Sequence, residues 1–264
     1  MLDQKNYAAI LIEKRGDGVA IATLNRPEKL NAVNGDLHHE LGTLWRDADA
    51  DRGVRALVVT GAGRAFCAGG DFSPGSTPLG SRGTPAFEEG RRVVDHLLEC
   101  RKPVISAVNG YAMGLGATVA LLADVVVAGR SAVFADTHVA MGIGAGDGGQ
   151  LIWPLLVGVN RAKYYLMTGE RVHAEEAERG GLVNFVVDDA QLMERALAIA
   201  SRLAQGPSQA ISASKMAINQ WMRSISATVL PHSLALEEAC FGSADNREAV
   251  AAFNEKRRPV FKGR

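Results

Sequence analysis

The sequence predicts an α/β fold with a helical C-terminal region, on the strength of three observations. A short apolar run at residues 56–60 is followed by the glycine-rich loop GAGRAFCAGGD, and a second run at 104–108 is followed by NGYAMGLG and a helical pattern. Buried strands that alternate with such loops and helices are typical of α/β architecture. Beyond residue 192 only helical patterns recur. We therefore expect a core at residues 1–200 and a helical region at 201–264.

Local patterns predict the individual elements. Two β-rich runs flank Gly16-Asp17-Gly18 and indicate a hairpin. Short apolar runs predict strands at 8–15, 19–24, 56–60, 104–108 and 124–128. Apolar residues at helical spacing predict helices at 35–50, 87–98, 115–122, 192–204, 208–225, 229–241 and 247–253. The Ser-, Gly- and Pro-rich segment 73–85 is expected to be mobile.

Composition excludes several classes of function. The 29 basic and 29 acidic residues cancel, so no overall charge draws the chain to nucleic acid or to an anionic membrane. Cys67, Cys100 and Cys240 are far apart and lack CxxC spacing, which argues against disulfides and a zinc site and favours a reducing compartment. No apolar run approaches the roughly 18 residues of a membrane span, and the N-terminus reaches charge too early for a signal peptide. We expect a cytoplasmic protein.

One apolar, glycine-rich segment, FADTHVAMGIGAGDGGQ (134–150), carries His138 and Asp147 with no other ionisable residue between them. A histidine beside a carboxylate is typical of a catalytic pair, because the carboxylate fixes the tautomer of the imidazole and raises its basicity. A structural interpretation stays open, in which His138 bonds a backbone carbonyl and Asp147 caps a helix that begins near Gly148.

The two glycine-rich loops are candidates for an oxyanion hole. Each follows a buried strand, where small residues leave backbone N–H groups unshielded, and two converging N–H groups stabilise negative charge on a carbonyl oxygen. Tight turns without function are a weaker explanation for two such loops than for one. A dinucleotide-binding site is disfavoured, because the third glycine of G-x-G-x-x-G is replaced by Val119 in one loop and by Phe66 in the other.

Four strings, NRPEKLNAVN, GRAFCAGGD, KPVISAVNGYAMGLG and GLVNFVV, resemble the crotonase (enoyl-CoA hydratase/isomerase) superfamily in order and spacing over nearly the whole chain. The resemblance implies a spiral of ββα units whose C-terminal helical region builds homotrimers, commonly paired into hexamers. It implies an acyl-CoA thioester as substrate and no cofactor beyond the coenzyme A that the substrate carries. By position, the oxyanion donors are the N–H groups of Ala68 and Leu115.

The resemblance also assigns residues that bind the substrate or its CoA. The basic candidates are Arg26 and Lys29 early in the chain, and Lys256 or Lys262 near its end, which in the family reach the CoA of a neighbouring subunit. The loop residues expected at the substrate are Cys67, Gly69, Gly70, Asp71 and Gly114. For Asp71, a helix-capping role after the glycine turn is favoured over that of a catalytic acid.

The sequence departs from the family where hydrating members carry two glutamates that hold water and move its proton. Thr118 and His138 occupy those two positions. A threonine hydroxyl orients water but is a poor base, whereas an imidazole with a pKa of about 6.5 is a competent acid or base. We therefore assign the proton transfer to His138 and Asp147, with Thr118 as an auxiliary hydrogen-bonding residue, and expect no metal ion.

Enoyl-CoA hydration is the favoured reaction. Double-bond isomerisation, which needs a base but no held water, is the first alternative. C–C hydrolysis of β-diketones is the second: that branch pairs a His with an Asp here, but it also uses a second histidine near the second oxyanion loop, and residues 109–118 contain none. A non-catalytic acyl-CoA-binding scaffold is the third. His38 and His39 are expected on the polar side of a helix, outside the site.

Overall fold

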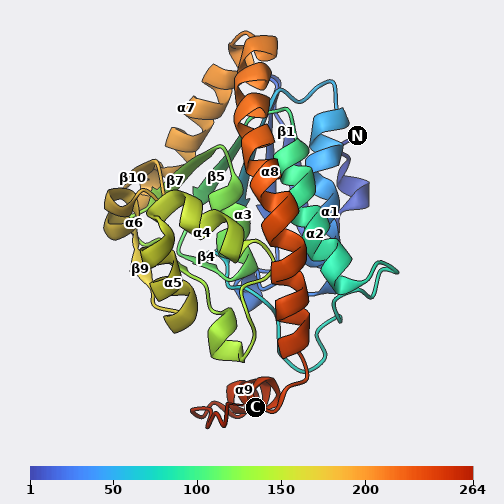
Figure 1. The fold of residues 1–264 in the computed structure, drawn as a ribbon. Coiled ribbons are helices and arrows are strands. Elements are labelled where there is room, and N and C mark those ends of the chain that lie inside the picture. The colour runs from blue at the N-terminus through green and yellow to red at the C-terminus, as the bar shows by residue number, and fades with distance from the viewer. Residues whose placement is uncertain (264) are drawn as a thin grey trace.

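The computed structural model describes residues 1–263 and centres on a six-stranded sheet with the order β1-β2-β3-β5-β7-β10 (Figure 1). The predicted hairpin is confirmed, since β1 and β2 pair antiparallel with Ile10 opposite Leu24. The other neighbours in this sheet run parallel. The strands are β1 (Ile10–Lys14), β2 (Val19–Leu24), β3 (Ala56–Gly61), β5 (Val104–Val108), β7 (Val125–Gly129) and β10 (Phe185–Val187).

A second, four-stranded sheet holds the ends of both glycine-rich loops and was not predicted from the sequence. Its order is β4-β6-β8-β9, with β4 (Ala65–Cys67), β6 (Tyr111–Met113), β8 (Val133–Ala135) and β9 (Val172–His173). Strands of two or three residues are too short to show an apolar alternation. This sheet matters for the site because β8 leads directly into the segment that carries His138.

Helices cover both faces of the larger sheet. Alternate residues of β3 show the division: Val58 packs in the cluster with α7 (Leu192–Gln205), while Leu57 and Val59 belong to the main core on the other face. That main core includes α1 (Gly35–Ala50), α2 (Ala86–Glu99) and α3 (Leu115–Leu122). The remaining helices are α4 (Gly149–Val157), α5 (Val159–Thr168), α6 (Ala174–Gly180), α8 (Ser208–Cys240) and α9 (Ala244–Glu255). Short 3₁₀ turns include η2 (Pro27–Lys29) and η3 (His138–Met141).

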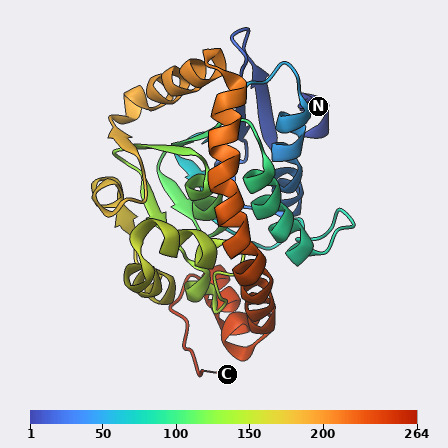
Figure 2. The same ribbon diagram turned by 45° about the horizontal axis from the view of Figure 1, so that its top comes forward.

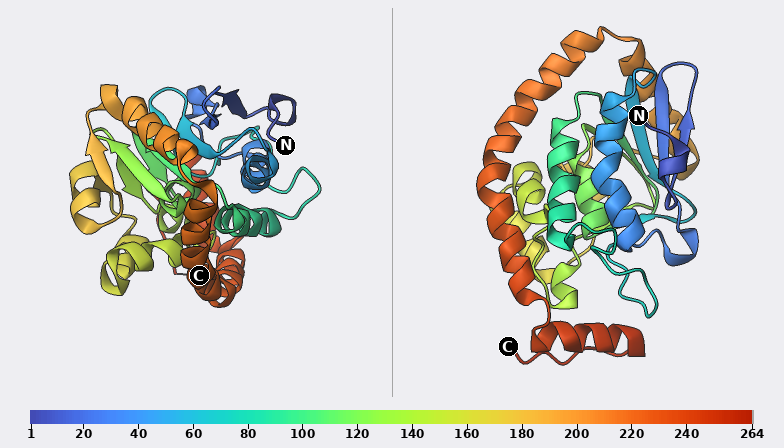
Figure 3. Two further views of the ribbon diagram at one scale, coloured as in Figure 1. Left: turned by 90° about the horizontal axis from the view of Figure 1, so that it is seen from above. Right: turned by 90° about the vertical axis from the view of Figure 1, so that its right-hand side faces the viewer.

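The sequence prediction of separate helices at 208–225 and 229–241 is wrong, because α8 is one helix of 33 residues with Pro231 inside it. Its buried face, which includes Ser226, Leu230 and Leu234, continues past the proline. Tertiary packing along that face outweighs the helix-breaking tendency of proline. Figures 2 and 3 show α8 running the length of the molecule between α2 and α4, with α9 turned across its far end.

None of the helices within residues 1–263 combines the length and the apolar character needed to cross a membrane, and this includes α8.

The first half of α8 is fixed to the sheet by one buried charge pair. Lys215 Nζ lies 2.7 Å from Asp124 Oδ2 and donates to the Lys102 carbonyl at 2.8 Å, while its side chain is only 6% exposed. Further along α8, Arg223 pairs with Glu99 at 3.2 Å, but both side chains are more than 40% exposed. The two pairs therefore differ in burial while sharing a helix.

We expect Lys215→Met to lower the free energy of unfolding by about 3 kcal/mol, because it leaves the Asp124 carboxylate without its counter-charge. The matched surface variant Arg223→Met is expected to cost less than about 1 kcal/mol. Urea denaturation followed by circular dichroism measures both. Equal destabilisation by the two substitutions would contradict the anchoring role of Lys215.

Candidate active site

A cavity of about 380 Å³ opens between α1, α2, the N-terminus of α3, η3 and the second half of α8. Most of its wall is apolar, with side chains such as Phe72, Phe87 and Leu234. The ionisable residues of the wall are His38, Asp71, His138, Asp147 and Glu237. A mostly apolar pocket with a few converging polar groups is typical of a small-molecule site.

The imidazole of His138 is held between carboxylates from both sides. Asp136, two residues earlier, accepts a hydrogen bond from Nδ1 at 2.6 Å. Asp147 Oδ2 lies 3.2 Å from Nε2, and Glu237 Oε1 lies 3.9 Å from the same nitrogen. Asp147 therefore contacts His138 and also lines the cavity, whereas the alternative helix-capping role is not seen: Gly148 precedes α4 without a side-chain cap.

The turn between β6 and α3 brings His138 close to the start of α3. Gly114 has a φ of +52°, which favours glycine, and a Cβ there would lie 3.3 Å from His138 Cε1. The imidazole ring thus packs directly on the glycine backbone. The next residue, Leu115, begins α3 and lines the cavity. Its N–H has no acceptor within the helix, as is general for the first residues of helices.

Glu237 reaches the site from α8, more than ninety residues later in the chain than His138. The 134–150 segment approaches α8 at Gly146, where a Cβ would lie 2.6 Å from Glu237 Oε2. Ser233, one turn earlier on α8, donates its hydroxyl to the Gly146 carbonyl at 2.8 Å. This contact fixes the distance between Asp147 and the carboxyl group of Glu237.

The surroundings of His138 and Glu237 raise the pKa of both residues. Burial by itself lowers the pKa of His138, but the charges of Asp147 and Asp136 and their hydrogen bonds outweigh it and raise this pKa well above 6.5. Burial and the charge of Asp147 raise the pKa of Glu237 to about 8. Near pH 7 the imidazole of His138 is therefore cationic and Glu237 holds its proton.

Several buried oxygens in this cluster have no hydrogen-bond partner among residues 1–263. They are Thr118 Oγ1, Asp136 Oδ2, Asp147 Oδ1 and Glu237 Oε2. A buried polar atom without a partner costs about 1–3 kcal/mol, so such atoms are rare in regions that serve packing alone. Their concentration around His138 is typical of a site that handles protons or polar ligands.

The structure separates the two expected oxyanion donors. Leu115 lies at the cavity, as expected. The N–H of Ala68 instead donates to the Leu30 carbonyl at 3.0 Å, and Gly70 rather than Ala68 forms the wall. Thr118 is fully buried beside this region without reaching the cavity wall formed by the described residues.

Of the basic residues expected to contact CoA, one is largely buried and three are exposed. Arg26 is largely buried and its Nη2 pairs with Asp71 at 2.9 Å, so this guanidinium supports the loop rather than facing solvent. Asp71 binds Arg26 and Ser73 and caps no helix, which corrects the sequence prediction for it. Lys29, Lys256 and Lys262 are exposed.

Cys67 and Gly69 lie behind the loop surface. Burial raises the pKa of the Cys67 thiol to about 12, and its side chain packs against Gly116, so Cys67 belongs to the core rather than to the substrate wall. Gly69 accepts a hydrogen bond from Val33 N at 2.7 Å through its carbonyl oxygen. Of the predicted loop contacts, Gly70, Asp71 and Gly114 reach the cavity.

Sequence reasoning missed three residues of the site. Asp136 precedes His138 by two residues, and Glu237 lies on the buried face of α8 together with Leu230 and Leu234. His38 was expected on the polar side of its helix, but it is only 4% exposed and lines the cavity. The sequence offered little signal for Glu237 or His38, because a polar residue on a helix is usually exposed.

One imidazole nitrogen and two carboxylate oxygens, from His138, Asp147 and Glu237, lie within 4.8 Å of one another, a spacing that also suits a divalent cation. Metal ligation requires an unprotonated nitrogen. A cation bound here would have to displace the proton that the raised pKa of His138 otherwise keeps on the imidazole.

Comparisons with known proteins identify the family. The family model described as Enoyl-CoA hydratase/isomerase matches residues 14–264. The chain belongs to this family. A probable enoyl-CoA hydratase of Rhodobacter capsulatus is 40% identical, over 94% of this chain and 96% of its own. The 1,2-epoxyphenylacetyl-CoA isomerase of Escherichia coli is 38% identical, also over 94% of this chain and 96% of its own. The crystal structure of an enoyl-CoA hydratase/isomerase from Mycobacterium paratuberculosis matches with a TM-score of 0.85 and 39% identity, covering 92% of this chain and 97% of that one.

The match to the family model confirms the resemblance to the crotonase superfamily that the sequence showed. The match to the solved structure confirms the predicted α/β fold with C-terminal helices. Membership of the family also makes the protein an enzyme homologue for which an acyl-CoA substrate is expected. One of the two relatives is named as a hydratase and the other as an isomerase. The reaction type must therefore be argued from the site itself.

The raised pKa of Glu237 predicts how stability depends on pH. The folded protein holds this proton up to about pH 8, whereas an unfolded glutamate releases it near 4.5. The folded state therefore loses stability relative to the unfolded chain as the pH rises through this range, by up to about 1.4 kcal/mol per pH unit. Glu237→Gln removes this contribution, so the variant gains stability relative to the parent as the pH rises.

Urea denaturation of both proteins at several values between pH 5 and pH 8 measures the effect. The neighbouring variant Glu238→Gln, at an exposed position of the same helix, is the control and is expected to follow the parent. Parallel profiles for the parent and Glu237→Gln would show that Glu237 does not hold its proton in the folded protein.

Proposed function

We propose that this protein hydrates a 2-enoyl thioester of coenzyme A. The observation that carries the proposal is the position of two carboxyl groups in one cavity with Leu115: Asp147, which contacts the imidazole of His138, and Glu237, whose pKa is raised. Hydrating an enoyl thioester needs a base for water, an acid for the α-carbon and a donor for the developing oxyanion. These groups supply all three functions without the two glutamates that the family places at positions 118 and 138.

In the proposed reaction, Asp147 accepts a proton from water while the water oxygen attacks the β-carbon. Negative charge develops on the thioester oxygen, which accepts a hydrogen bond from the Leu115 N–H. The neutral Glu237 donates its proton to the α-carbon, and the proton on Asp147 passes to Glu237 to restore the starting state. His138 holds Asp147 in place through its charged imidazole and is assigned no proton transfer, which changes the role expected for it from the sequence.

The second oxyanion donor comes from the loop around residues 67–71. The expected donor, the Ala68 N–H, serves in this proposal only if it exchanges the Leu30 carbonyl for the thioester oxygen. Gly70, which already forms part of the wall, is the nearest alternative in that loop. Thr118 remains an auxiliary residue, with its hydroxyl behind the cluster.

C–C hydrolysis of a β-diketone is the second candidate, and one observation favours it. The family branch that carries out this reaction uses a second histidine, and here His38 supplies an imidazole to the same cavity from α1. In that reaction water adds to one carbonyl, the adjacent C–C bond breaks and the resulting enolate takes a proton. The same carboxyl groups serve both reactions, so the substrates must separate them.

We also propose that the enzyme needs no cofactor or metal beyond the CoA of its substrate, and that Lys29, Lys256 and Lys262 contact this CoA. We further propose that the enzyme works in the cytoplasm as a homotrimer or hexamer. The exposed apolar side chains of the last two helices support the assembly, since contiguous apolar patches mark interfaces and two of these side chains lie one turn apart on α8. They include Ile218, Trp221, Leu236 and Phe253.

The function is tested with crotonyl-CoA, a longer 2-enoyl-CoA and a 3-enoyl-CoA, with the absorbance of the conjugated thioester as the readout, and with a free β-diketone, whose cleavage is followed by mass spectrometry of the products. We expect hydration of the 2-enoyl substrates. In Asp147→Asn, kcat is expected to fall by about 10²- to 10⁴-fold, the usual size of a general acid or base effect, with the fold intact. Asp95→Asn, on the exposed face of α2, is the control and is expected to retain activity.

Unchanged kcat in Asp147→Asn would exclude this residue as the base. Conversion of the 3-enoyl-CoA alone would assign double-bond isomerisation instead of hydration. Cleavage of the diketone without turnover of any thioester would favour the second candidate, and binding without turnover would favour a non-catalytic scaffold.

A further inference from the structure

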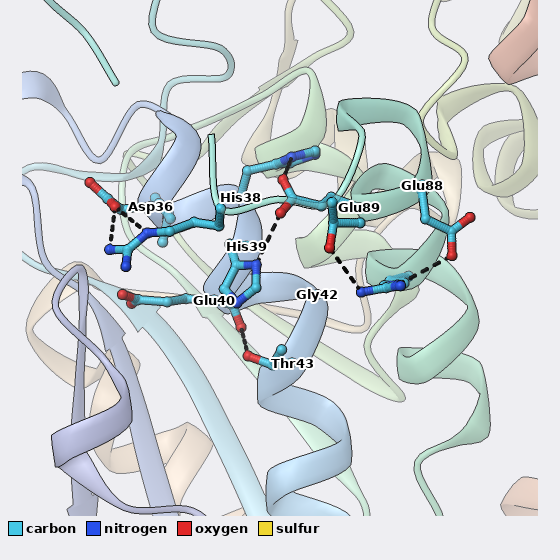
Figure 4. A network of polar contacts seen from close by, with 12 residues as sticks. Asp36, His38, His39, Glu40, Gly42, Thr43, Glu88 and Glu89 are labelled. Atoms are coloured by element: carbon cyan, nitrogen blue, oxygen red, sulfur yellow. Dashed lines mark hydrogen bonds and ion pairs between the residues drawn. The ribbon is translucent and has the colours of Figure 1, made fainter. Parts of the chain in front are cut away.

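His38 and His39 are neighbours in α1 that share one partner on α2 but face different surroundings. Nδ1 of His38 lies 3.1 Å from Glu89 Oε2, and Nδ1 of His39 lies 3.0 Å from Glu89 Oε1 (Figure 4). Glu89 is 1% exposed. Burial favours the neutral acid, but the hydrogen bonds and charges of the two histidines outweigh it and lower the pKa of Glu89. The carboxylate therefore accepts one N–H from each imidazole.

The second nitrogen of His38 faces the cavity. Its Nε2 has no hydrogen-bond partner among residues 1–263, and it lies beside Gly90, where a Cβ would be 3.7 Å away. Gly90 and His38 both form part of the cavity wall. The side chain of His39, by contrast, is 35% exposed and belongs to no part of that wall.

The surroundings of His38 Nε2 in the wall are apolar. A Cβ at Gly90 would also lie 3.9 Å from Leu234 Cδ2, and Phe87 on α2 and Val33 before α1 complete this part of the wall. Packing α1 against α2 requires only a residue of suitable shape at position 38, and His39 already provides an N–H for Glu89. A hydrogen-bonding nitrogen beside apolar side chains lets a small-molecule pocket select among similar ligands.

We propose that His38, fixed by Glu89, binds an oxygen substituent on the acyl group of the substrate, at a position remote from the thioester. The substrate class is thus an acyl-CoA with a hydroxyl or oxo group on its distal chain, rather than a plain hydrocarbon chain. With Nδ1–H donated to Glu89, Nε2 accepts a hydrogen bond from a hydroxyl, and a protonated imidazole donates to an oxo group. The inference rests on the proposed CoA-thioester function and specifies its substrate.

His38→Asn separates this role from packing. The asparagine side-chain N–H₂ occupies nearly the place of Nδ1 and retains the bond to Glu89, while the atom that faces the cavity is lost. His39→Asn is the matched control, because it changes the other imidazole on the same carboxylate. Urea denaturation of both variants verifies that each is folded.

The readout is binding, so that it does not depend on turnover. Isothermal titration measures the Kd of octanoyl-CoA and of its hydroxy and oxo derivatives substituted along the distal half of the chain. In the parent and in His39→Asn, we expect at least one oxygenated derivative to bind about tenfold more tightly than octanoyl-CoA, the effect of one hydrogen bond to a held group. In His38→Asn, the derivatives and octanoyl-CoA are expected to bind within about twofold of one another.

Two results would overturn the inference alone: no preference for any oxygenated derivative in the parent, or a preference that survives in His38→Asn. A preference lost equally in His39→Asn would assign the effect to the α1–α2 contact and would also overturn it. Failure of the parent to bind any acyl-CoA would overturn the proposed function together with this inference.

Discussion

The ion-paired imidazole of His138 is the interaction on which the site depends. Asp136 holds Nδ1 at 2.6 Å and Asp147 lies 3.2 Å from Nε2, so a charged ring links the end of β8 to the loop before α4. Without that positive charge, three buried carboxyl groups would lie close together, and their repulsion would be severe. With it, Asp147 has a cationic partner, and Glu237, whose pKa is raised, is the group that holds a proton. The chemistry proposed for the cavity follows from this division.

Several parts of the fold converge to maintain the arrangement. The turn at Gly114 lets the imidazole lie against the backbone where α3 begins, and Gly146 lets the loop approach Glu237 on α8. The long course of α8 is essential, because a break at Pro231 would remove Glu237 from the site. Lys215, at the other end of the same helix, fixes it to the sheet. The helical C-terminal region therefore contributes directly to the candidate active site.

The sequence predicted the fold and half of the site for identifiable physical reasons. Buried strands, glycine-rich loops and helical periodicity are local signals, and they located β3, β5, α3 and the hairpin. His138 and Asp147 could be chosen as candidates because they interrupt an apolar segment, and the structure places both at the cavity. Glu237 and His38 lacked such a signal, since a charged residue on an amphipathic helix is usually exposed, and only tertiary packing turns these two inward. The free N–H of Ala68 was inferred from the family, but the Leu30 carbonyl accepts it here.

The central claim, that His138 is a fixed cation rather than a base, is tested most directly by ¹⁵N NMR of the histidine side chains. The chain has six histidines, and His138→Asn assigns the signal of interest by its disappearance. Both nitrogens of His138 are expected to carry protons still at pH 7 to 8, where an ordinary imidazole with a pKa of about 6.5 is mostly neutral. A neutral His138 with one unprotonated nitrogen at pH 7 would contradict the claim, and would return the role of the base to the imidazole.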